Sequence, residues 1–177
     1  MNRYAITFGV ALAAIGAAAS GAATASVVQK SEYNQASGTM CQGALPNFEG
    51  NFRKRPLAVV NQGTTNAFLT CGLTSQYDSS TGGVPEVLLV VTNRNAASTD
   101  MSCTLVDGYV DSTVGFADYF PQTMTVAGAS STSFDWSAST TGGTNAPVYG
   151  YPGISCNVPG SFEVNIEGQS YSEEIGA

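Results

Sequence analysis

From Leu57 onward the chain is a series of short apolar, β-branched and aromatic runs, separated by clusters of Gly, Asn, Ser and Asp at intervals near ten residues. Such runs are typical of β-strands, and no segment has the length and period of a long helix. The predicted strands are Leu57–Asn61, Ala67–Ser75, Glu86–Asn93, Met101–Val110, Gln122–Val126, Ser131–Trp136, Ile154–Val158 and Phe162–Ile166. This pattern predicts an all-β fold.

The distribution of apolar residues within these strands indicates how they are layered. Leu69, Cys71 and Leu73 share one face because strand side chains alternate, whereas Val87–Val91 is apolar on both faces and indicates a central strand. We predict a two-sheet antiparallel β-sandwich, Ig-like or jelly-roll-like, with Trp136 in or near its core. A small β-barrel is the alternative.

Three segments between or before these strands have turn or loop character. Asn61–Asn66 and Asn93–Asp100 contain turn residues, and we expect each to link two neighbouring antiparallel strands as a hairpin. The segment Phe48–Arg53 is predicted to be a loop with one helical turn, because Pro56 prevents a longer helix.

The first 25 residues resemble a secretory signal peptide. A positive start at Arg3 precedes an Ala-rich run of low polarity, and Ala23–Ala25 forms a cleavage site of small residues. Residues 26–39 are polar and without clear periodicity, so they are predicted to form a loose N-terminal arm. Residues 40–177 are then a single β-sandwich domain of a secreted or periplasmic protein, with no stable membrane insertion after cleavage.

Charge and composition exclude several classes of function. The chain has six Lys and Arg, 13 Asp and Glu and no His, so its formal net charge is −7. Loss of Arg3 with the signal peptide leaves five positive and 13 negative residues, or −8, which argues against nucleic acid as a partner. Without His there is no Ser-His-Asp triad, no Cys-His pair and no imidazole metal ligand. We therefore predict that the protein is not an enzyme and has no cofactor.

The four cysteines are Cys41, Cys71, Cys103 and Cys156. Their even number, wide spacing and predicted export indicate two disulfides, and a four-thiolate zinc site is disfavoured because no pair has the usual close spacing. Three pairings are possible, which sequence alone does not separate rigorously. The preferred one joins Cys41 to Cys71, linking the N-terminal segment to an early strand, and Cys103 to Cys156, linking two core strands.

Two groups of acidic residues are candidates for chemical sites. Glu163 and Glu167 would lie about 13 Å apart along a straight strand, too far for a pair of glycosidase carboxylates. Asp107, Asp111 and Asp118 suggest a calcium loop but lack the spacing of a calcium motif, so turn chemistry is the favoured interpretation. We predict no catalytic residue and no metal site.

Two further groups are candidates for contact with a ligand or partner. Arg53, Lys54 and Arg55 hold three of the five mature cations and could contact an anionic polymer, phosphate or acidic partner, although a solvated turn paired with the protein's own acids is the simpler interpretation. Tyr149 and Tyr151 lie in a Gly- and Pro-rich segment near Cys156, where they could stack on sugars or contact a protein, or simply cover one end of the sandwich.

The residues around the cysteines also carry a resemblance. The segments Met40–Gln42, Phe68–Cys71, Met101–Leu105 and Ile154–Pro159, followed by a last strand, resemble the uncharacterised small secreted four-cysteine proteins of proteobacteria. The resemblance extends from about Cys41 to Glu167 and implies a disulfide-linked β-sandwich exported by a bacterium, without implying catalytic residues.

These observations predict a non-enzymatic protein that binds or associates with a protein or glycan at the cell surface and is a monomer. One alternative is a pilin-like or matrix subunit that assembles by strand addition, with the arm at residues 26–39 as the donor. The other is a secreted hydrolase or protease inhibitor.

Overall fold

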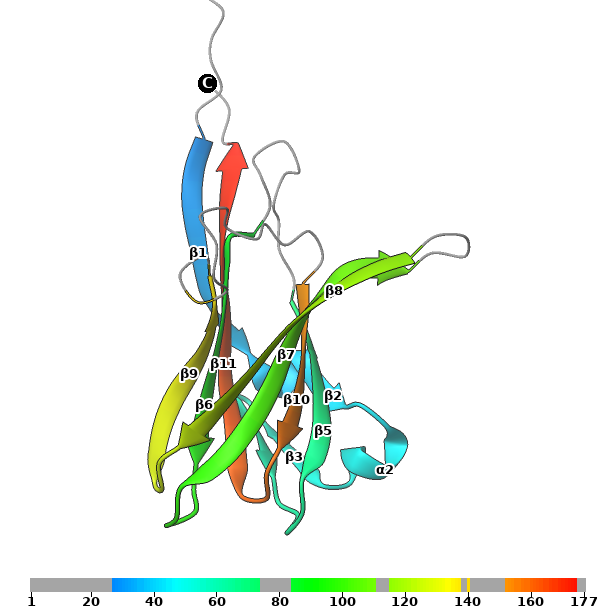
Figure 1. Cartoon of the computed structure of the whole chain (residues 1–177), viewed down its shortest axis with the longest axis vertical. Helices are drawn as coiled ribbons and strands as arrows, with labels where there is room; N and C mark the ends of the chain where they lie inside the picture. Colours follow the sequence, from blue (N-terminus) through cyan, green and yellow to red (C-terminus); the bar gives the residue numbers. More distant parts are fainter. Residues whose placement is uncertain (1–26, 74–83, 111–114, 138–139, 141–151, 175–177) are drawn as a thin grey trace, which may run out of the picture.

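The computed structural model describes residues 27–73, 84–110, 115–137, 140 and 152–174, and these residues form two antiparallel sheets packed face to face (Figure 1). This arrangement confirms the predicted β-sandwich. The predicted signal peptide lies outside the described residues. Among the described residues, no helix has the length and apolar character needed to cross a membrane.

Each sheet has a continuous order of five strands, and a sixth strand extends the first sheet. Sheet A contains β3 (Phe52–Arg55), β4 (Ala58–Asn61), β11 (Phe162–Glu174), β6 (Glu86–Asn93) and β9 (Ser130–Trp136) in that order, with β1 (Val27–Ala36) also paired to β11. Sheet B contains β2 (Cys41–Gly43), β5 (Ala67–Gly72), β10 (Pro152–Val158), β7 (Thr99–Val110) and β8 (Gly115–Val126). Two single helical turns, α1 (Ser37–Met40) and α2 (Pro46–Glu49), flank β2, and α2 confirms the turn predicted near Phe48.

The eight predicted strands are all present, but three further strands were missed. The bounds of β6 match the prediction, whereas β8 begins at Gly115 rather than Gln122 and β11 continues to Glu174 rather than Ile166. The missed strands are β1, β2 and β3. They are short or polar, so they join the sheets through backbone ladders that leave little alternation in the sequence.

The prediction of a loose N-terminal arm is wrong for most of its length. β1 runs antiparallel to the distal half of β11, from Val27 opposite Glu174 to Ala36 opposite Ile166. The polar residues of β1 give no apolar alternation, and the strand with which it pairs lies at the other end of the chain. No local pattern therefore predicts this strand. The arm is therefore engaged within its own chain and is not a free donor strand for another subunit.

The two turn-rich segments do not form hairpins, and that prediction is also wrong. The segment after β4 leads from sheet A to β5 in sheet B, and the segment after β6 leads from sheet A to β7 in sheet B. Each is an arch across the core. Turn residues specify a reversal of the chain, but not whether the next strand joins the same sheet or the opposite one.

A buried asparagine holds each arch. The side chain of Asn61, at the end of β4, donates through Nδ2 to the carbonyl oxygens of Thr65 and Val158, each at 2.9 Å. Its Oδ1 accepts from the backbone N–H of Gly63 at 2.9 Å. One side chain thus satisfies three backbone groups at a place where neither sheet can do so.

Asn93, at the end of β6, repeats this pattern in the second arch. Its Nδ2 donates to the carbonyl oxygens of Ala97 at 2.8 Å and Val126 at 3.0 Å, and its Oδ1 accepts from the N–H of Asn95 at 2.9 Å. The same residue type at the same strand end gives the same local structure, which explains why both arches begin with asparagine.

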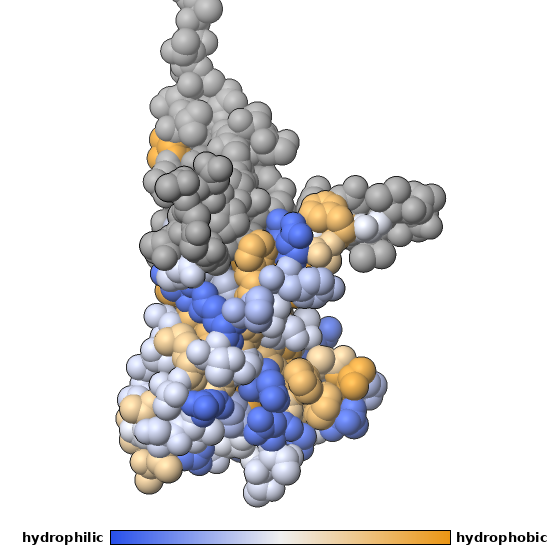
Figure 2. Space-filling view, viewed as in Figure 1, coloured by the Kyte–Doolittle hydropathy of each residue, from blue (hydrophilic) through white to orange (hydrophobic). Residues whose placement is uncertain are grey.

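Beyond the sandwich, β7 and β8 continue as a two-stranded ribbon. β10 pairs with β7 only as far as Asp107, whereas β7 and β8 pair on to Val110 opposite Gly115. The ribbon projects to the side in Figure 1, and Figure 2 shows apolar surface on it, where the Phe116 side chain is 47% exposed. A Cβ at Gly108 would lie 2.1 Å from the carbonyl oxygen of Phe116, so the close approach of the two strands requires glycine there.

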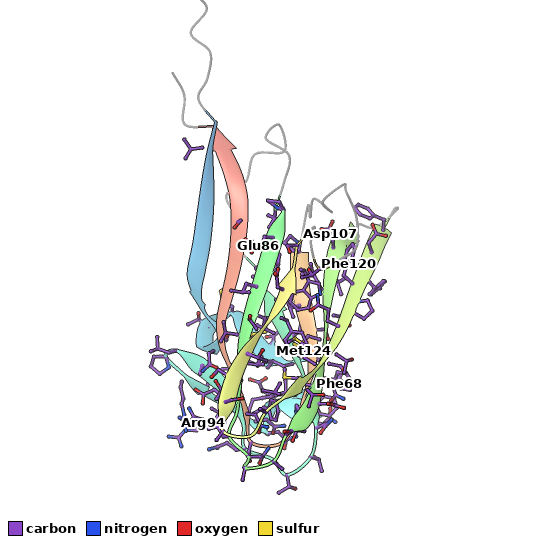
Figure 3. All side chains as sticks on the ribbon, turned by 60° about the vertical axis from the view of Figure 1, so that its left-hand side comes forward. Phe68, Glu86, Arg94, Asp107, Phe120 and Met124 are labelled. Atoms are coloured by element: carbon purple, nitrogen blue, oxygen red, sulfur yellow. A yellow bond between two sulfur atoms is a disulfide. The ribbon has the colours of Figure 1, made fainter. Side chains whose placement is uncertain are left out.

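Large apolar side chains from both sheets fill the space between them. Trp136, Phe134 and Phe162 are fully buried, and the rings of Phe134 and Trp136 stack with centroids 5.8 Å apart. Phe120 and Met124 of β8 pack against this core while remaining partly exposed (Figure 3). The predicted core position of Trp136 is confirmed.

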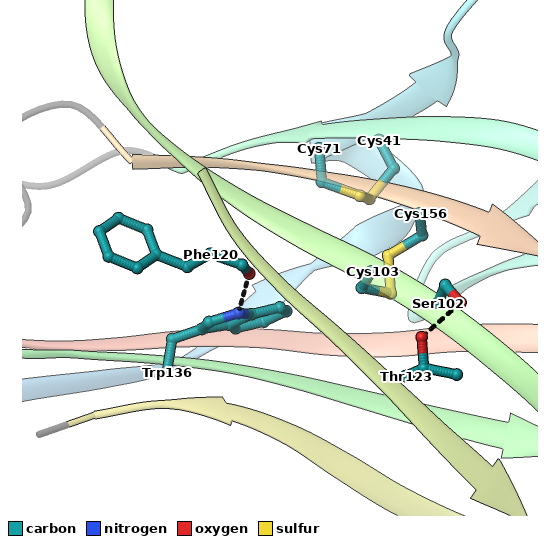
Figure 4. Close-up of a disulfide and its surroundings, with 8 residues drawn as sticks. All are labelled: Cys41, Cys71, Ser102, Cys103, Phe120, Thr123, Trp136 and Cys156. Carbon is teal, nitrogen blue, oxygen red and sulfur yellow. Dashed lines mark hydrogen bonds between the residues drawn. A yellow bond between two sulfur atoms is a disulfide. The ribbon is translucent and has the colours of Figure 1, made fainter. Parts of the chain in front are cut away.

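Two side chains join the edge strands β8 and β9, which belong to opposite sheets. The Trp136 Nε1–H donates to the carbonyl oxygen of Phe120 at 2.7 Å (Figure 4), and Gln122 Nε2 donates to the carbonyl oxygen of Asp135 at 2.7 Å. These bonds satisfy edge carbonyls and hold the two layers together along this side of the sandwich.

Both disulfides lie within sheet B, on its core-facing side (Figure 4). Cys41 is bonded to Cys71 across β2 and β5, and Cys103 is bonded to Cys156 across β7 and β10, each between directly opposite residues. The preferred pairing is confirmed. Since structural disulfides persist in oxidising compartments, the fold fits a location outside the cytoplasm.

Candidate functional site

Glu163 is held in an ion pair and does not take part in a pair of catalytic carboxylates. It is buried, and its Oε2 accepts from Arg94, while its Oε1 accepts from Asn165 Nδ2 at 3.0 Å. A β-bulge follows Val164, so Glu163 is opposite Thr92 whereas Glu167 is opposite Leu89. The distance predicted between these two residues assumed a straight strand, and the bulge shows that the strand is not straight.

Two of the three acidic residues predicted as a possible calcium loop lie in the paired strands β7 and β8 rather than in a turn. Asp107 and Asp118 are directly opposite each other in the ladder, and Asp111 lies outside the described residues. Within the described residues, no three His, Cys, Asp or Glu side chains are grouped as metal ligands. The turn interpretation is wrong for Asp107 and Asp118, because both are in paired strands.

Of the two predicted contact groups, only the basic run lies within the described residues. Tyr149 and Tyr151 lie outside the described residues. The basic run Arg53–Arg55 forms β3, an edge strand, and not a turn. Pairing with the protein's own acids is confirmed for Lys54, whose Nζ lies 2.9 Å from Glu49 Oε1.

The outer face of sheet B carries an uncharged surface that sequence reasoning missed. Alternate residues of its strands enter the core, so the others point outward. We call these outward residues the sheet B platform: Gln42, Phe68, Thr70, Gly72, Ser102, Thr104, Val106, Tyr119, Pro121, Thr123, Gly153, Ser155 and Asn157. Hydroxyl and amide groups make up most of its polar surface, and none of its side chains is charged.

Strand register arranges the platform in three rows. The middle row crosses the whole sheet: Gln42, Thr70, Ser155, Thr104 and Pro121. From strand geometry the platform is about 20 Å wide across the strands and about 14 Å long along them. Its hydroxyl groups are therefore spread over an area large enough for several groups of an extended ligand.

Hydrogen bonds between neighbouring strands orient some of the hydroxyl groups. Ser102 Oγ and Thr123 Oγ1 are 2.8 Å apart across β7 and β8 (Figure 4). On the outward face of these two strands, the first charged side chain beyond the rows is Asp100, which accepts from Thr125 Oγ1 at 2.6 Å. The carboxylate thus lies at the margin of the platform, where a hydroxyl group already binds it.

An exposed aromatic ring stands at one corner of the platform. The Tyr119 side chain is 67% exposed and neighbours Pro121 on the same face of β8. A hollow of about 250 Å³ adjoins them between the two edge strands, lined by Tyr119, Phe120, Pro121, Gln122, Trp136 and Thr140. A ring, an amide and a hydroxyl group therefore meet at one open groove, which we call the Tyr119 groove.

A second aromatic residue marks the opposite side of the platform. Phe68 of β5 is 46% exposed, and its ring packs at a tilt against Phe48 of α2, with centroids 5.7 Å apart. The platform thus has an aromatic residue on each side and hydroxyl and amide groups between them.

The disulfides lie directly behind the platform. They cross-link β2 to β5 and β10 to β7, and the β5–β10 ladder joins the two linked pairs. Four of the five strands of sheet B are therefore held by covalent bonds and their common ladder. A surface held in one shape loses less entropy on binding a ligand than a mobile one.

Part of this surface could have been found from the sequence. The outward residues of the predicted strands Met101–Val110 and Ile154–Val158 are the polar members of an alternating pattern. Tyr119 was missed because the prediction began that strand at Gln122. Which residues become neighbours within a row depends on the order of strands in the sheet, and no local sequence pattern specifies that order.

Comparisons with known proteins give similarity to solved structures only. No protein-family model and no curated protein matches the chain. Among solved structures, it is similar to a family 11 carbohydrate-binding module from Clostridium thermocellum in complex with a β-1,3-1,4-mixed-linked tetrasaccharide, at 12% identity and a TM-score of 0.40, over 81% of this chain and 86% of that one. It is also similar to TmCBM61 in complex with β-1,4-galactotriose, at 8% identity and a TM-score of 0.34, over 82% and 88% of the two chains.

Proposed function

We propose that the protein is a non-enzymatic binding domain that holds an uncharged glycan on the sheet B platform, with one sugar ring in the Tyr119 groove. The observation that carries the proposal is the platform itself, which is free of charged side chains, rich in hydroxyl and amide groups and bordered by exposed aromatic rings.

The chemistry of the platform matches that of a neutral sugar chain. Sugars present hydroxyl groups at their edges and apolar C–H groups on their faces, so they need hydrogen-bonding groups and a flat apolar partner together. Thr104, Ser155 and Gln42 supply the first, and the rings of Tyr119 and Pro121 supply the second. An anionic ligand would meet no cation among the described residues of this face.

The platform is less suited to a protein partner. The centre of a protein–protein interface is usually depleted in polar groups and contains clustered aromatic or aliphatic anchors. Here the aromatic rings Phe68 and Tyr119 lie at the sides, and the middle row carries hydroxyl and amide groups on every strand except β8, where Pro121 lies. This distribution favours a ligand that is itself covered with hydroxyl groups.

The proposed setting is the periplasm or the exterior of the cell, where the predicted signal peptide would deliver the chain. Both disulfides belong to the sheet that carries the platform, so an oxidising compartment preserves the proposed binding surface. Non-enzymatic action is supported by the absence of His from the sequence and by the ion pair that engages Glu163.

The test is affinity electrophoresis of the oxidised protein through gels containing neutral polysaccharides, comparing Tyr119→Ala with Phe116→Ala. Both residues are exposed aromatics of β8, but Phe116 lies on the projecting ribbon and outside the platform. We expect Tyr119→Ala to weaken binding about tenfold, equal to about 1.4 kcal/mol, and Phe116→Ala to change it less than twofold. Equal losses in the two variants, or no retention of the parent protein by any neutral polysaccharide, would refute the proposal.

A further inference from the structure

All positively charged side chains that the structure describes lie at one corner of sheet A. Arg53, Lys54 and Arg55 form most of the edge strand β3, and Arg94 begins the arch that follows β6. The formal net charge of the chain is −7, so this corner is basic on an otherwise acidic protein. An uneven distribution of this kind attracts anions to one place and repels them elsewhere.

Strand register places two of the arginines side by side on the outer face. Arg53 is opposite Val60, which is opposite Glu163 on the next strand, and Glu163 binds Arg94. Arg55 lies two residues further along β3, so the same face presents it about 7 Å from Arg53. Two strand spacings separate Arg53 from Glu163, or about 10 Å.

The arginines differ from Lys54 in their partners. Lys54 lies on the other face of β3, in an ion pair with Glu49. Arg53 and Arg55 form no ion pair with any residue that the structure describes, and both are exposed. Each planar guanidinium is therefore available to bind a carboxylate or sulfate group through two parallel hydrogen bonds.

A hollow of about 300 Å³ adjoins the basic corner, lined by Val60, Asn61, Gln62, Arg94 and Ser161. The side chain of Arg94 is 55% exposed even though it also binds Glu163. Figure 3 shows Arg94 on the side of the molecule at which the β3–β4 hairpin projects. An anionic ligand held by Arg53 and Arg55 would thus meet amide and hydroxyl groups on reaching the hollow.

We propose that this basic corner, formed by Arg53, Arg55, Arg94 and the adjoining hollow, is a second binding site, whose ligand is an acidic polysaccharide. The guanidinium groups bind carboxylates that recur along the sugar chain, and the hollow accepts the hydroxyl groups of one sugar ring. The site lies on sheet A and shares no residue with the sheet B platform. The protein would then connect an acidic glycan to a neutral one.

An anionic membrane is the main competing ligand, and Leu57 is the residue that separates the two. Leu57 is 76% exposed at the tip of the β3–β4 hairpin, where it could enter a lipid surface. One leucine supplies little apolar area for insertion into a membrane. The ion pair with Glu49 also offsets the charge of Lys54, which weakens its attraction to anionic lipids. The hollow at Arg94 lies away from that tip, so a lipid surface entered by Leu57 would leave the hollow unused, and the observations favour the polysaccharide.

The experiment measures binding of the oxidised, full mature chain to polygalacturonate at low salt, with fully methyl-esterified polygalacturonate as the uncharged ligand. We expect salt-dependent binding to the first only, falling at least tenfold between 50 and 200 mM salt because the contacts are ionic, whereas any binding of the esterified polymer to the platform should not change with salt. The double variant Arg53→Gln/Arg55→Gln should lose at least fivefold in affinity. Lys54→Gln removes a positive charge on the other face of the same strand and should lose less than twofold.

Three results would overturn this proposal. They are equal losses for Lys54→Gln and the double variant, tighter binding to poly-L-glutamate than to polygalacturonate, and tighter binding to phosphatidylglycerol vesicles that Leu57→Ser abolishes. Thermal unfolding of each variant checks that the fold is retained. Tyr119→Ala should leave polygalacturonate binding unchanged, so failure of either binding site is distinguishable from failure of the other.

Discussion

Replacing the buried Asn93 by alanine should destabilise the protein by about 3 kcal/mol. The substitution removes three hydrogen bonds, of which the one to the Val126 carbonyl is buried and the other two, with Ala97 and Asn95, are partly buried. A buried group left without a partner costs about 1–3 kcal/mol, and each partly buried bond contributes about 0.5–1.5 kcal/mol. Water cannot replace the amide, because the Asn93 side chain is fully buried between the sheets.

Asn61→Ala should have the same cost, because Asn61 makes the same three types of bond in the first arch. Asn93→Asp should be at least as destabilising as Asn93→Ala, since it places a carboxylate oxygen against two carbonyl oxygens. Asn66→Ala is the matched control, because Asn66 is an exposed residue of the first arch and should change stability by less than about 0.5 kcal/mol.

The assay is urea unfolding of the oxidised protein, followed by far-UV circular dichroism. With a slope of about 1–3 kcal/mol per molar urea, a loss of about 3 kcal/mol lowers the midpoint by about 1–3 M. Costs below about 1 kcal/mol for both Asn61→Ala and Asn93→Ala would refute the reasoning that these side chains hold the arches. A large cost for only one of them would refute the equivalence of the two arches.

Three further predictions concern the disulfides, the sandwich edge and acid stability. Loop-closure entropy predicts that removing the Cys103–Cys156 disulfide, with a separation of 53 residues, lowers the free energy of unfolding by about 4 kcal/mol. Removing Cys41–Cys71, with a separation of 30 residues, should lower it by about 3.5 kcal/mol. Urea unfolding of paired Cys→Ala variants measures both losses, and a gain in stability from either would contradict the prediction. Trp136→Phe removes the hydrogen bond from the indole N–H to the carbonyl oxygen of Phe120 and some buried ring area, and it should cost about 1–3 kcal/mol in the same assay. A neutral result would show that the edge bond contributes nothing. The hydrogen bond from Lys54, followed by that from the Gly43 backbone N–H, lowers the pKa of Glu49 below its ordinary 4.5. The stability that these contacts contribute is therefore present above pH 4.5 and is lost as the pH falls through the lower pKa of the folded protein. A pKa of Glu49, measured by NMR titration, that does not rise in Lys54→Gln would contradict this.

Local patterns were sufficient to predict the class of fold. Runs such as Glu86–Asn93 carry their own strand signal in β-branched and apolar residues, and the observed bounds of β6 are those of that run. The even number of cysteines predicted two disulfides, and alternation placed Cys71 and Cys103 on core-facing sides of strands. These features depend on residues close together in the chain, so the sequence shows them directly.

The candidate binding surfaces required the tertiary structure. The platform exists because β5, β10, β7 and β8 become neighbours in sheet B, although they come from three separate parts of the chain. The basic corner likewise depends on the β3–β4–β11 order, which brings Arg53 toward the ion pair of Arg94. No local pattern encodes these distances, because they follow from which strands pair.

The sequence by itself therefore determined that this chain forms strands, reverses direction between them and holds two cysteine pairs. The tertiary structure alone decided that the segments at Asn61 and Asn93 are arches between sheets, that residues 27–36 form a strand against the far end of the chain, and that Tyr119 faces solvent beside a groove. The physical reason is that turn and strand propensities act over a few residues. The choice of partner strand is made by burying the apolar faces of both sheets together, and that requirement involves the whole chain.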